Sequence, residues 1–411
     1  MAMKEFFKVT NLEDVFGYIP VFPVTGVEKI AVEKCYGRVL AADIVSAIDL
    51  PDFPRTTVDG YAVRASSTFG ASEGNPAFFT LKGVIGMGQV PDFSVAPGEA
   101  AEISTGGMLP QGTDSVVMVE HTESIDALTL EVYRSVAPGQ HVIEIGEDLK
   151  KGGKLLMPGL RLRPQEAGML AALGKKEVPV YRKPRIGIIS TGDEIVSIDE
   201  TLGPGKIRDI NTYTLSGLIH ASGGIPVSFG IVKDNFQALF DMCVQALETS
   251  DMVMLSGGSS VGTRDYTVEV FSKLPEPELL VHGISISPGK PTILATSGKK
   301  AIWGLPGHVV SAMVVFKMVI EPFIRHISGL NAPVIKKQSS PARLSRNIAS
   351  TQGRVDYIRV RIFHKDGERW AEPVLGKSGL IHTMIQADGL VEIDINTEGL
   401  DKGTIVEVIP L

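Results

Sequence analysis

Cysteine is almost absent from this chain of 411 residues, which contains only Cys35 and Cys243. The two cysteines are far apart in the sequence, and neither belongs to a CxxC pair or to a cluster of cysteine and histidine. This scarcity argues against a disulfide framework and a zinc site, and it is typical of proteins from a reducing compartment. We therefore expect a cytoplasmic protein.

The chain also lacks an excess of positive charge and a long hydrophobic run. Its 40 Lys and Arg residues stand against 47 Asp and Glu residues, which gives a formal net charge of −7. A negative chain is poorly suited to binding nucleic acid or an anionic membrane. The most apolar late stretch, residues 309–324, is interrupted by Lys317, Glu321 and Pro322. We expect no nucleic-acid partner and no membrane span.

Glycine, by contrast, is abundant. The 44 glycines are about 11% of the chain, where roughly 7% is usual, and 25 prolines accompany them. Many of these glycines cluster beside Asp, Ser and Thr, which are residue types that bind phosphate groups and metal ions. The length predicts two to four domains.

The middle of the chain predicts an open α/β domain over residues 182–328. Short apolar runs without alternation at 185–190, 226–232 and 252–256 are typical of parallel strands that are buried on both faces. An amphipathic helical pattern fills the space between the second and third runs, with Asp234 and Gln237 predicted as N-cap and N3 of a capping box. The pattern is that of a βαβ unit.

The flanking regions predict β structure and a divided domain. Period-two alternation from about Ala332 onward predicts a small β-barrel or β-sandwich over residues 329–411. Residues 45–145 are rich in turns and strand-like runs, so they predict a second β-rich domain. The first 44 residues and residues 146–181 carry helical pieces that are separated by Gly and Pro.

Two clusters of small and polar residues follow predicted strands of the α/β domain. The first is Ser190, Thr191, Gly192, Asp193 and Glu194, which could bind a phosphate or a metal ion. A turn with an N-cap residue would have the same sequence pattern. The second spans residues 256–266, where glycines, serines and Asp265 favour a phosphate loop over a flexible hinge. It matches neither a Walker loop nor a dinucleotide fingerprint.

Two further loops complete the set. Lys290 lies between prolines and is either a solvated lysine or a counter-charge for a phosphate, and Pro306, Gly307 and His308 lead into a helix. We expect all four loops to follow strands of one sheet and to converge at one edge.

The β-rich region repeats this chemistry in weaker form. Asp59 precedes a glycine as in a hairpin turn, Thr105 precedes two glycines, and Asp148 could be an ordinary surface acid. The eight histidines have no metal-ligand spacing, and no Ser/His/Asp nucleophile signature is present.

Taken together, these motifs resemble the molybdopterin molybdenumtransferases, the MoeA group, which includes the E domain of gephyrin. The resemblance rests on motifs in the family's order from residue 49 to 390, namely DLPDFPRTTVDGYAVR, ISTGGMLPQGTDSVVMVE, GED, EVPVYRKPR, STGDE, RDIN, SGGSSVGTRDYT, PGKP, GLPG and GKSGLIHTMIQADGL. Several motifs at matching spacing do not arise by chance.

The resemblance implies a multidomain α/β plus β fold. Its parts are a split elongated domain (1–44 and 146–181), an inserted β-rich domain (45–145), a central molybdopterin-binding-like α/β domain with a mainly parallel sheet (182–328) and a C-terminal β-barrel (329–411). It also implies a homodimer whose active-site cleft is shared between the α/β domain of one subunit and the β-rich domain of the other.

The resemblance further implies an enzyme that takes adenylylated molybdopterin and molybdate as substrates and, with Mg²⁺, releases AMP and leaves molybdenum on the dithiolene. It would act between a molybdopterin adenylyltransferase and downstream molybdoenzymes or chaperones. The implied catalytic residues are Asp59, Thr105, Asp148, Glu194 and Asp265. The metal would be held by Glu194, Asp265 and Asp234. Substrate-binding residues would be Ser190, Thr191, Gly192, Ser256, Gly257, Gly258, Ser260, Gly262, Lys290, Pro306, Gly307, Arg354 and Ser378.

Two positions depart from the family pattern. Ser287 stands where a lysine usually precedes PGKP, and His308 and Val309 replace the usual Asn-Pro pair. Alternatives to the transferase are a non-catalytic scaffold like gephyrin, a tungstate-preferring homologue and an adenylyltransferase acting one step earlier. The retained acids favour an enzyme over a scaffold, and the extra domains argue against the adenylyltransferase.

Overall fold

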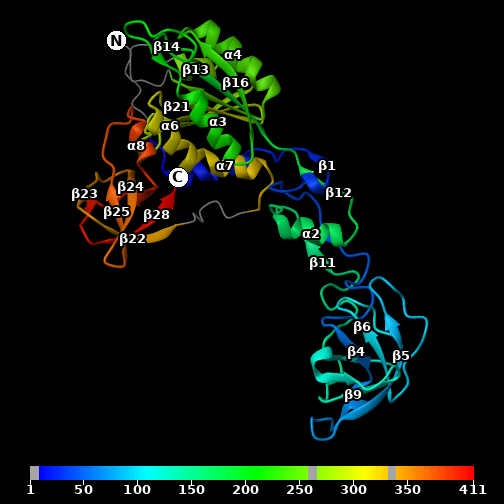
Figure 1. Cartoon of the computed structure of the whole chain (residues 1–411). Coiled ribbons are helices and arrows are strands. Elements are labelled where there is room, and N and C mark those ends of the chain that lie inside the picture. The colour runs from blue at the N-terminus through cyan, green and yellow to red at the C-terminus, as the bar shows by residue number, and fades with distance from the viewer. Residues whose placement is uncertain (1–8, 258–265, 332–338) are drawn as a thin grey trace, which may run out of the picture. The chain divides into compact units, whose positions relative to one another are not determined.

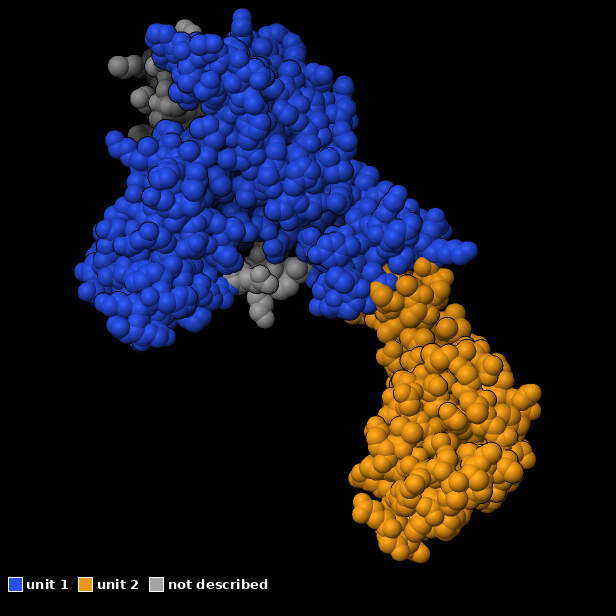
Figure 2. Space-filling model, in the orientation of Figure 1, with its two compact units in different colours: residues 1–42, 158–167, 176–411 blue, residues 43–157, 168–175 orange. Residues whose placement is uncertain are grey.

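The computed structural model describes residues 9–257, 266–331 and 339–411. The chain divides into two compact units, which Figure 2 colours separately. Unit 1 contains residues 1–42, 158–167 and 176–411, and unit 2 contains residues 43–157 and 168–175. Within the described ranges, no helix is both long and apolar enough to span a membrane.

A six-stranded mixed sheet forms the centre of unit 1 (Figure 1). Its strand order is β16 (Ile225–Val232), β13 (Arg185–Thr191), β17 (Met252–Ser256), β21 (Lys300–Leu305), β20 (Ile293–Ser297) and β18 (Pro277–His282). The first four strands are parallel, whereas β20 and β18 run antiparallel to their neighbours. Ser190 pairs in register with Ser256, and Ser256 with Leu305, so the carboxyl ends of three strands meet at one edge.

Helices cover both faces of this sheet. Alternate strand residues such as Ile186 and Ile188 pack with α3 (Asn211–Ala221), α6 (Val309–Val315), the π-helix η5 (Phe316–Ile320) and α7 (Glu321–Ile327). The intervening residues, such as Ile189, pack with α4 (Phe236–Thr249) and α5 (Tyr266–Phe271). Burial on both faces explains the apolar runs of β13 and β17. The same expectation is wrong for β16, which lies at the edge of the sheet and has only Val232 buried.

The predicted capping box of α4 is wrong. The N-cap is Asn235, whose Oδ1 accepts a hydrogen bond from the main-chain nitrogen of Ala238 at 3.0 Å. Asp234 therefore lies one residue before the cap, and its carboxyl group is free of that role.

The C-terminal region is a closed five-stranded barrel. Its strands are β24 (Val355–Lys365), β25 (Glu368–Pro373), β22 (Ser340–Leu344), β28 (Ile405–Pro410) and β26 (Gly389–Ile393), and β26 closes the barrel by pairing with β24. The strand β19 (Ile286–Ser287) adds to β24 at its edge. Smaller elements are β23 (Ile348–Ala349), β27 (Gly399–Leu400) and α8 (His382–Ile385).

Unit 2 is β-rich. Its six-stranded sheet has the order β7 (Ser115–Met118), β4 (Gly60–Val63), β6 (Glu99–Ile103), β5 (Ala77–Ile85), β9 (Thr129–Val132) and β8 (Thr122–Ser124). Two short pairs accompany it, β3 (Arg55–Thr56) with β10 (Val142–Ile143) and β2 (Ile44–Val45) with β11 (Lys154–Leu156). The 3₁₀ turns η3 (Ala65–Thr68) and η4 (Val119–His121) connect strands.

Two stretches that are distant in the sequence, one near the N-terminus and one near residue 180, pair with each other in unit 1. The strand β1 (Val27–Ala31) pairs antiparallel with β12 (Glu177–Tyr181), although about 150 residues of sequence separate them. The same region of the chain carries α1 (Leu12–Gly17), η1 (Ile19–Val21), η2 (Val32–Lys34) and α2 (Pro164–Ala172). A small parallel pair, β14 (Ile195–Val196) with β15 (Ile207–Arg208), precedes α3. The expected fold class, a multidomain α/β plus β protein with a C-terminal barrel, is confirmed.

Candidate functional site

A cavity of about 550 Å³ opens at the carboxyl ends of β13, β17 and β21. This is the edge of an open α/β sheet where ligands usually bind. The wall includes seven of the residues predicted to be catalytic or substrate-binding, namely Ser190, Thr191, Glu194, Ser256, Gly257, Pro306 and Gly307. It also includes residues that the strand-end reasoning missed, namely Arg208 and Asp209 before α3 and Asn211, the first residue of α3.

One wall of the cavity is a chain of side-chain hydrogen bonds that ends on Asp209. Thr212 Oγ1 donates to Asp209 Oδ2 at 2.6 Å, and the main-chain nitrogen of Thr212 lies 3.1 Å from Asp209 Oδ1. Ser190 Oγ lies 3.0 Å from Thr212 Oγ1. Asp209 and Ser190 are 8% and 3% exposed, so this network is held in place by its surroundings.

A second wall is built around Asn211. Its Nδ2 donates to Ser256 Oγ at 2.6 Å and to the main-chain oxygen of Gly307 at 2.9 Å. Asn211 thereby ties the first turn of α3 to the ends of β17 and β21. Its Oδ1 is buried without a hydrogen-bond partner among the described residues, a situation that costs about 1–3 kcal/mol. Because the unpaired Oδ1 lowers stability, stability alone does not explain why Asn211 occupies this position.

Gly257 shapes the floor at the end of β17. Its φ is +110°, and a Cβ added there would lie 2.1 Å from the main-chain oxygen of Thr191. Only glycine allows the chain to turn this close to the neighbouring strand. Gly257 itself lines the cavity at this point.

Three acids gather beside the cavity. The main-chain nitrogen of Asp234 lies 3.4 Å from Asp193 Oδ1, and Lys206 Nζ donates to the main-chain oxygen of Asp193 at 2.5 Å. Burial, together with the negative charges of Asp193 and Glu194, raises the pKa of Asp234. Asp234 Oδ1 is buried with no hydrogen-bond partner among the described residues. Carboxylate oxygens are ligands that Mg²⁺ prefers. A cation bound between these acids would reduce the repulsion between their negative charges.

The expectation that all four loops follow strands of one sheet is wrong for Lys290. The preceding strand, β19, pairs with β24 of the barrel instead of joining the central sheet. Its loop nevertheless reaches the same edge, because β20 is antiparallel and Ile293 lies beside Gly304 of β21. Pro291 therefore lines the cavity, whereas Lys290 is exposed and outside the lining.

The barrel contributes one loop to the site. The main-chain nitrogen of Val310 donates to the oxygen of Ser378 at 3.0 Å, and Gly379 and His308 both line the cavity. Arg354 instead pairs with the buried Asp356 of β24 at 3.0 Å. Gly192 does not line the cavity but precedes its acids, with a φ of +148°.

The predicted residues of unit 2 form a smaller group. Asp59 Oδ1 accepts hydrogen bonds from the main-chain nitrogen and from Oγ1 of Thr105, at 2.7 and 2.9 Å. These bonds lower the pKa of Asp59, the main-chain bond having the larger effect. Asp148 is exposed, and its main-chain nitrogen donates to Leu50 at 3.1 Å. The structure therefore brings Asp59 and Thr105 together.

Four predicted residues, Gly258, Ser260, Gly262 and Asp265, lie outside the described residues. Among the residues that are described, no three Asp, Glu, His or Cys side chains are arranged to hold a metal ion. The acids Glu194 and Asp234 would therefore require a further ligand, such as Asp265 or water, to complete a metal site.

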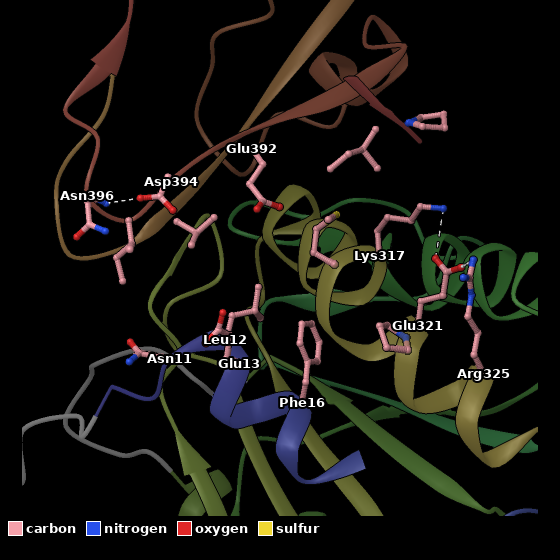
Figure 3. A pocket seen from close by; sticks show the side chains of 16 residues that line it. Asn11, Leu12, Glu13, Phe16, Lys317, Glu321, Arg325, Glu392, Asp394 and Asn396 are labelled. Atoms are coloured by element: carbon pink, nitrogen blue, oxygen red, sulfur yellow. Dashed lines mark hydrogen bonds and ion pairs between the residues drawn. The ribbon is translucent and has the colours of Figure 1, made fainter. Parts of the chain in front are cut away.

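A larger cavity, of about 710 Å³, lies elsewhere in unit 1, between α1, the helices η5 and α7, and the barrel (Figure 3). Its cations Lys317 and Arg325 both pair with Glu321, at 3.2 and 2.6 Å. Glu392 and Asp394 face it from the barrel side (Figure 3). Because its cations are paired and further acids line it, this cavity is less suited to an anionic ligand than the one at the strand ends.

Comparisons with known proteins cover nearly the whole chain. The MoeA N-terminal region (domain I and II) matches residues 9–174, a probable molybdopterin binding domain matches residues 187–326, and the MoeA C-terminal region (domain IV) matches residues 341–411. The crystal structure of the molybdopterin biosynthesis MoeA protein from Pyrococcus horikosii superposes with a TM-score of 0.82 and 38% identity, covering 98% of this chain and 99% of that one.

Two curated relatives agree with this. A molybdopterin biosynthesis protein of Methanocaldococcus jannaschii, whose assignment is itself provisional, is 37% identical over 93% of this chain and 92% of its own. A protein of Bacillus subtilis named molybdopterin molybdenumtransferase is 31% identical over 93% of this chain and 89% of its own.

Proposed function

This chain belongs to the MoeA family, and from that membership we propose that it is a molybdopterin molybdenumtransferase. In the proposed reaction it takes adenylylated molybdopterin and molybdate, releases AMP and leaves molybdenum on the dithiolene. The Bacillus subtilis relative carries the name of this activity.

The proposal rests mainly on one observation: groups suited to binding phosphate and acidic side chains lie together at the strand-end cavity. At the strand ends, the hydroxyl group of Ser256 and the main chain at Gly257 offer groups for phosphate oxygens, and Ser190 lies beside them. Glu194 lines the same cavity, and Asp234 lies close enough for the charge of Glu194 to raise its pKa. A pyrophosphate link between two organic groups needs donors for its oxygens and a cation for its charge.

The acids fit a Mg²⁺ ion. Glu194 and Asp234 would hold it, with Asp265 as a further ligand. Burial, and to a lesser extent the charges of Asp193 and Glu194, raise the pKa of Asp234, and a divalent cation would favour its ionised form. A bound Mg²⁺ would supply positive charge to the phosphate oxygens as AMP departs. The protein's own share is to orient the phosphates through Thr191, Gly192, Ser256 and Gly257, together with Gly258, Ser260 and Gly262.

Other residues would position the remaining parts of the substrates. Pro306 and Gly307 shape the wall through their main chain, and Ser378 lies where the barrel meets α6. Lys290 is exposed and could neutralise phosphate charge from the rim, and Arg354 would act from the barrel. Asp59, Thr105 and Asp148 would orient the pterin, molybdate or the attacking oxygen.

We further propose that the active protein is a homodimer in which the strand-end cavity of one subunit is completed by Asp59, Thr105 and Asp148 of unit 2 from the other subunit. The proposal is supported by the family resemblance and by the location of the acids in two different units. In the cytoplasm, such an enzyme would receive its substrate from a molybdopterin adenylyltransferase and pass the cofactor to molybdoenzymes or chaperones.

The function is tested with the full-length protein, adenylylated molybdopterin, Mg²⁺ and molybdate. The expected result is AMP release together with formation of a cofactor that activates an apo-molybdoenzyme. Parallel reactions with tungstate measure the preference between the two oxyanions. If AMP were released equally without any oxyanion and no metal were incorporated, the proposal would fail and only hydrolysis would remain.

A further inference from the structure

Two serines of the cavity occupy matching positions on neighbouring strands. Ser190 lies one residue before the end of β13 and pairs in register with Ser256 at the end of β17. Each is only 3% exposed, and each lines the cavity. Consecutive residues of α3, Asn211 and Thr212, contact them separately, so one helical turn controls both hydroxyl groups.

The contact with Asn211 determines how Ser256 can bind a ligand. The Nδ2 group also donates to the main-chain oxygen of Gly307, which can only accept, and this fixes the orientation of the Asn211 amide. Ser256 Oγ therefore accepts from Nδ2 at 2.6 Å. A hydroxyl has one hydrogen, and that of Ser256 finds no acceptor among the described residues. Ser256 is thus available as a hydrogen-bond donor.

The contact with Thr212 has the opposite effect on Ser190. Both oxygens of Asp209 accept from Thr212, one from its main-chain nitrogen and one from Oγ1. The single hydrogen of Thr212 Oγ1 is therefore already used. In the 3.0 Å contact between Ser190 and Thr212, Ser190 must be the donor. Ser190 consequently presents only its lone pairs to the cavity.

We propose that Asn211 and Thr212 are positioning residues that give the two serines opposite hydrogen-bonding roles. Ser256 donates to a phosphate oxygen of the ligand, and Ser190 accepts from a hydroxyl or N–H group of the same ligand. This inference rests on the proposed function, because it requires a ligand in which a phosphate is joined to an organic group that carries donors. A bare phosphate compound would use Ser256 alone.

The test compares two probes, AMP and inorganic pyrophosphate, by calorimetric titration of the full-length protein in Mg²⁺ buffer. Ser256→Ala and Asn211→Asp should weaken the binding of both probes by at least about 10-fold, which corresponds to about 1.4 kcal/mol. The double variant combines Ser256→Ala with Asn211→Asp. Because Asn211 acts through Ser256, its affinity for pyrophosphate should lie within about twofold of the affinity of whichever single variant binds less tightly.

Thr212 provides the matched pair of variants. Thr212→Val keeps the shape but frees the hydrogen of Ser190, so it should weaken AMP at least about 5-fold and leave pyrophosphate within about twofold. Thr212→Ser keeps the hydroxyl and should bind both probes like the wild type. Where Asn211→Asp does not fold, the Ser256 and Thr212 variants carry the test.

The inference is overturned if Thr212→Val weakens both probes equally or neither, if Thr212→Ser behaves like Thr212→Val, or if the wild type binds neither probe. The fate of the proposed function is measured separately by turnover. Transferase activity without this binding pattern would overturn the inference alone. The binding pattern without transferase activity would overturn the proposed function alone.

Discussion

Asp193 Oδ1 lies 3.4 Å from the main-chain nitrogen of Asp234, which places two carboxyl groups beside each other at the edge of the central sheet. The arrangement is unfavourable for the second of them. Burial is the larger cause of the raised pKa of Asp234, and the charges of Asp193 and Glu194 add to it. Such repulsion is typical of sites selected for binding and not for stability.

Replacing Asp234 with Asn should therefore stabilise the protein while weakening Mg²⁺ binding. A raised carboxyl pKa means that ionisation costs more free energy in the folded state than in the unfolded state. The resulting loss of stability begins above the unfolded-state pKa and is complete once pH has risen through the folded-state pKa. Because Asp234 is half-buried, Asp234→Asn should raise Tm by about 1–2 °C in EDTA at neutral pH and by nothing near pH 3. Scanning calorimetry at both pH values measures this.

The same variant should lose the increase in Tm that millimolar MgCl₂ gives the wild type. The control is Asp241→Asn, which removes an exposed acid of α4 that accepts a hydrogen bond from Gln237. That control should leave both measurements unchanged. A lower Tm for Asp234→Asn in EDTA would show that the carboxylate is stabilising and would contradict the interpretation.

Gly257 should not tolerate a side chain, whereas Gly307 should. An added Cβ at Gly257 would meet the main-chain oxygen of Thr191 at 2.1 Å and would impose a strained φ of +110°. Gly257→Ala should therefore destabilise the protein by about 1–3 kcal/mol and reduce transferase activity at least about 10-fold. At Gly307 the nearest atom to a Cβ would be 3.7 Å away.

Urea unfolding compares the two variants, with Gly307→Ala expected to unfold within about 0.5 kcal/mol of the wild type. Equal stability of both variants would mean that the turn after β17 relaxes easily, and the cavity floor described above would then need revision.

The sequence patterns predicted the strands of the central sheet but not every helix that covers it. The strands β13 and β17 were predictable because burial on both faces demands continuous apolar residues. The apolar run of β16 also predicted a strand, but the expected burial on both faces was wrong, because β16 lies at the edge of the sheet. Helix α3 was not predicted, because its sequence, NTYTLSGLIHA, contains glycine and is less amphipathic than that of α4. It forms because Leu215 and Ile219 pack against the sheet, and such tertiary contacts override weak local preference.

The site shows the same division. Ser190, Ser256 and Gly257 could be predicted by looking where buried strands end. The role of Asn211 could not, because it depends on side-chain hydrogen bonds to residues 45 and 96 positions away. The two-residue strand β19 was also beyond prediction, since nothing in so short a segment distinguishes pairing with the barrel from pairing with the central sheet.

Arg182 and Asp251 should make the protein sensitive to acid. Two nitrogens of Arg182 donate to the two carboxylate oxygens of Asp251, at 2.9 and 2.7 Å, and the main-chain nitrogen of Arg185 donates to the same carboxylate at 2.7 Å. Burial alone would raise the pKa of Asp251, but these hydrogen bonds outweigh it and lower the pKa.

A lowered carboxyl pKa stabilises the fold above the unfolded-state value of roughly 3.9 and loses that contribution as pH falls through the folded value. Asp251→Asn should therefore cost about 1–3 kcal/mol at neutral pH, and the cost should shrink as pH falls below roughly 3.9 and through the lower pKa of the folded state. Arg182→Lys cannot reproduce the two-pronged contact and should cost less, about 0.5–1.5 kcal/mol. A pH-independent loss for Asp251→Asn would rule out the charge as its cause.

The shared cleft of the proposed homodimer predicts complementation between two inactive variants. Asp59→Ala removes the acid of unit 2 that accepts two hydrogen bonds from Thr105, and Glu194→Ala removes the acid of the strand-end cavity in unit 1. Each variant alone should lose at least about 100-fold in turnover. If each cleft combines unit 1 of one subunit with unit 2 of the other, a mixed dimer contains one doubly altered cleft and one intact cleft.

Random reassortment of equal amounts makes half of the dimers mixed, so unfolding and refolding the two variants together should restore roughly a quarter of wild-type turnover. The control places both substitutions in one chain and mixes it with Asp59→Ala, where every cleft keeps at least one altered residue and activity should stay low. If the first mixture stayed as inactive as its components while gel filtration showed mixed dimers, each cleft would belong to a single chain.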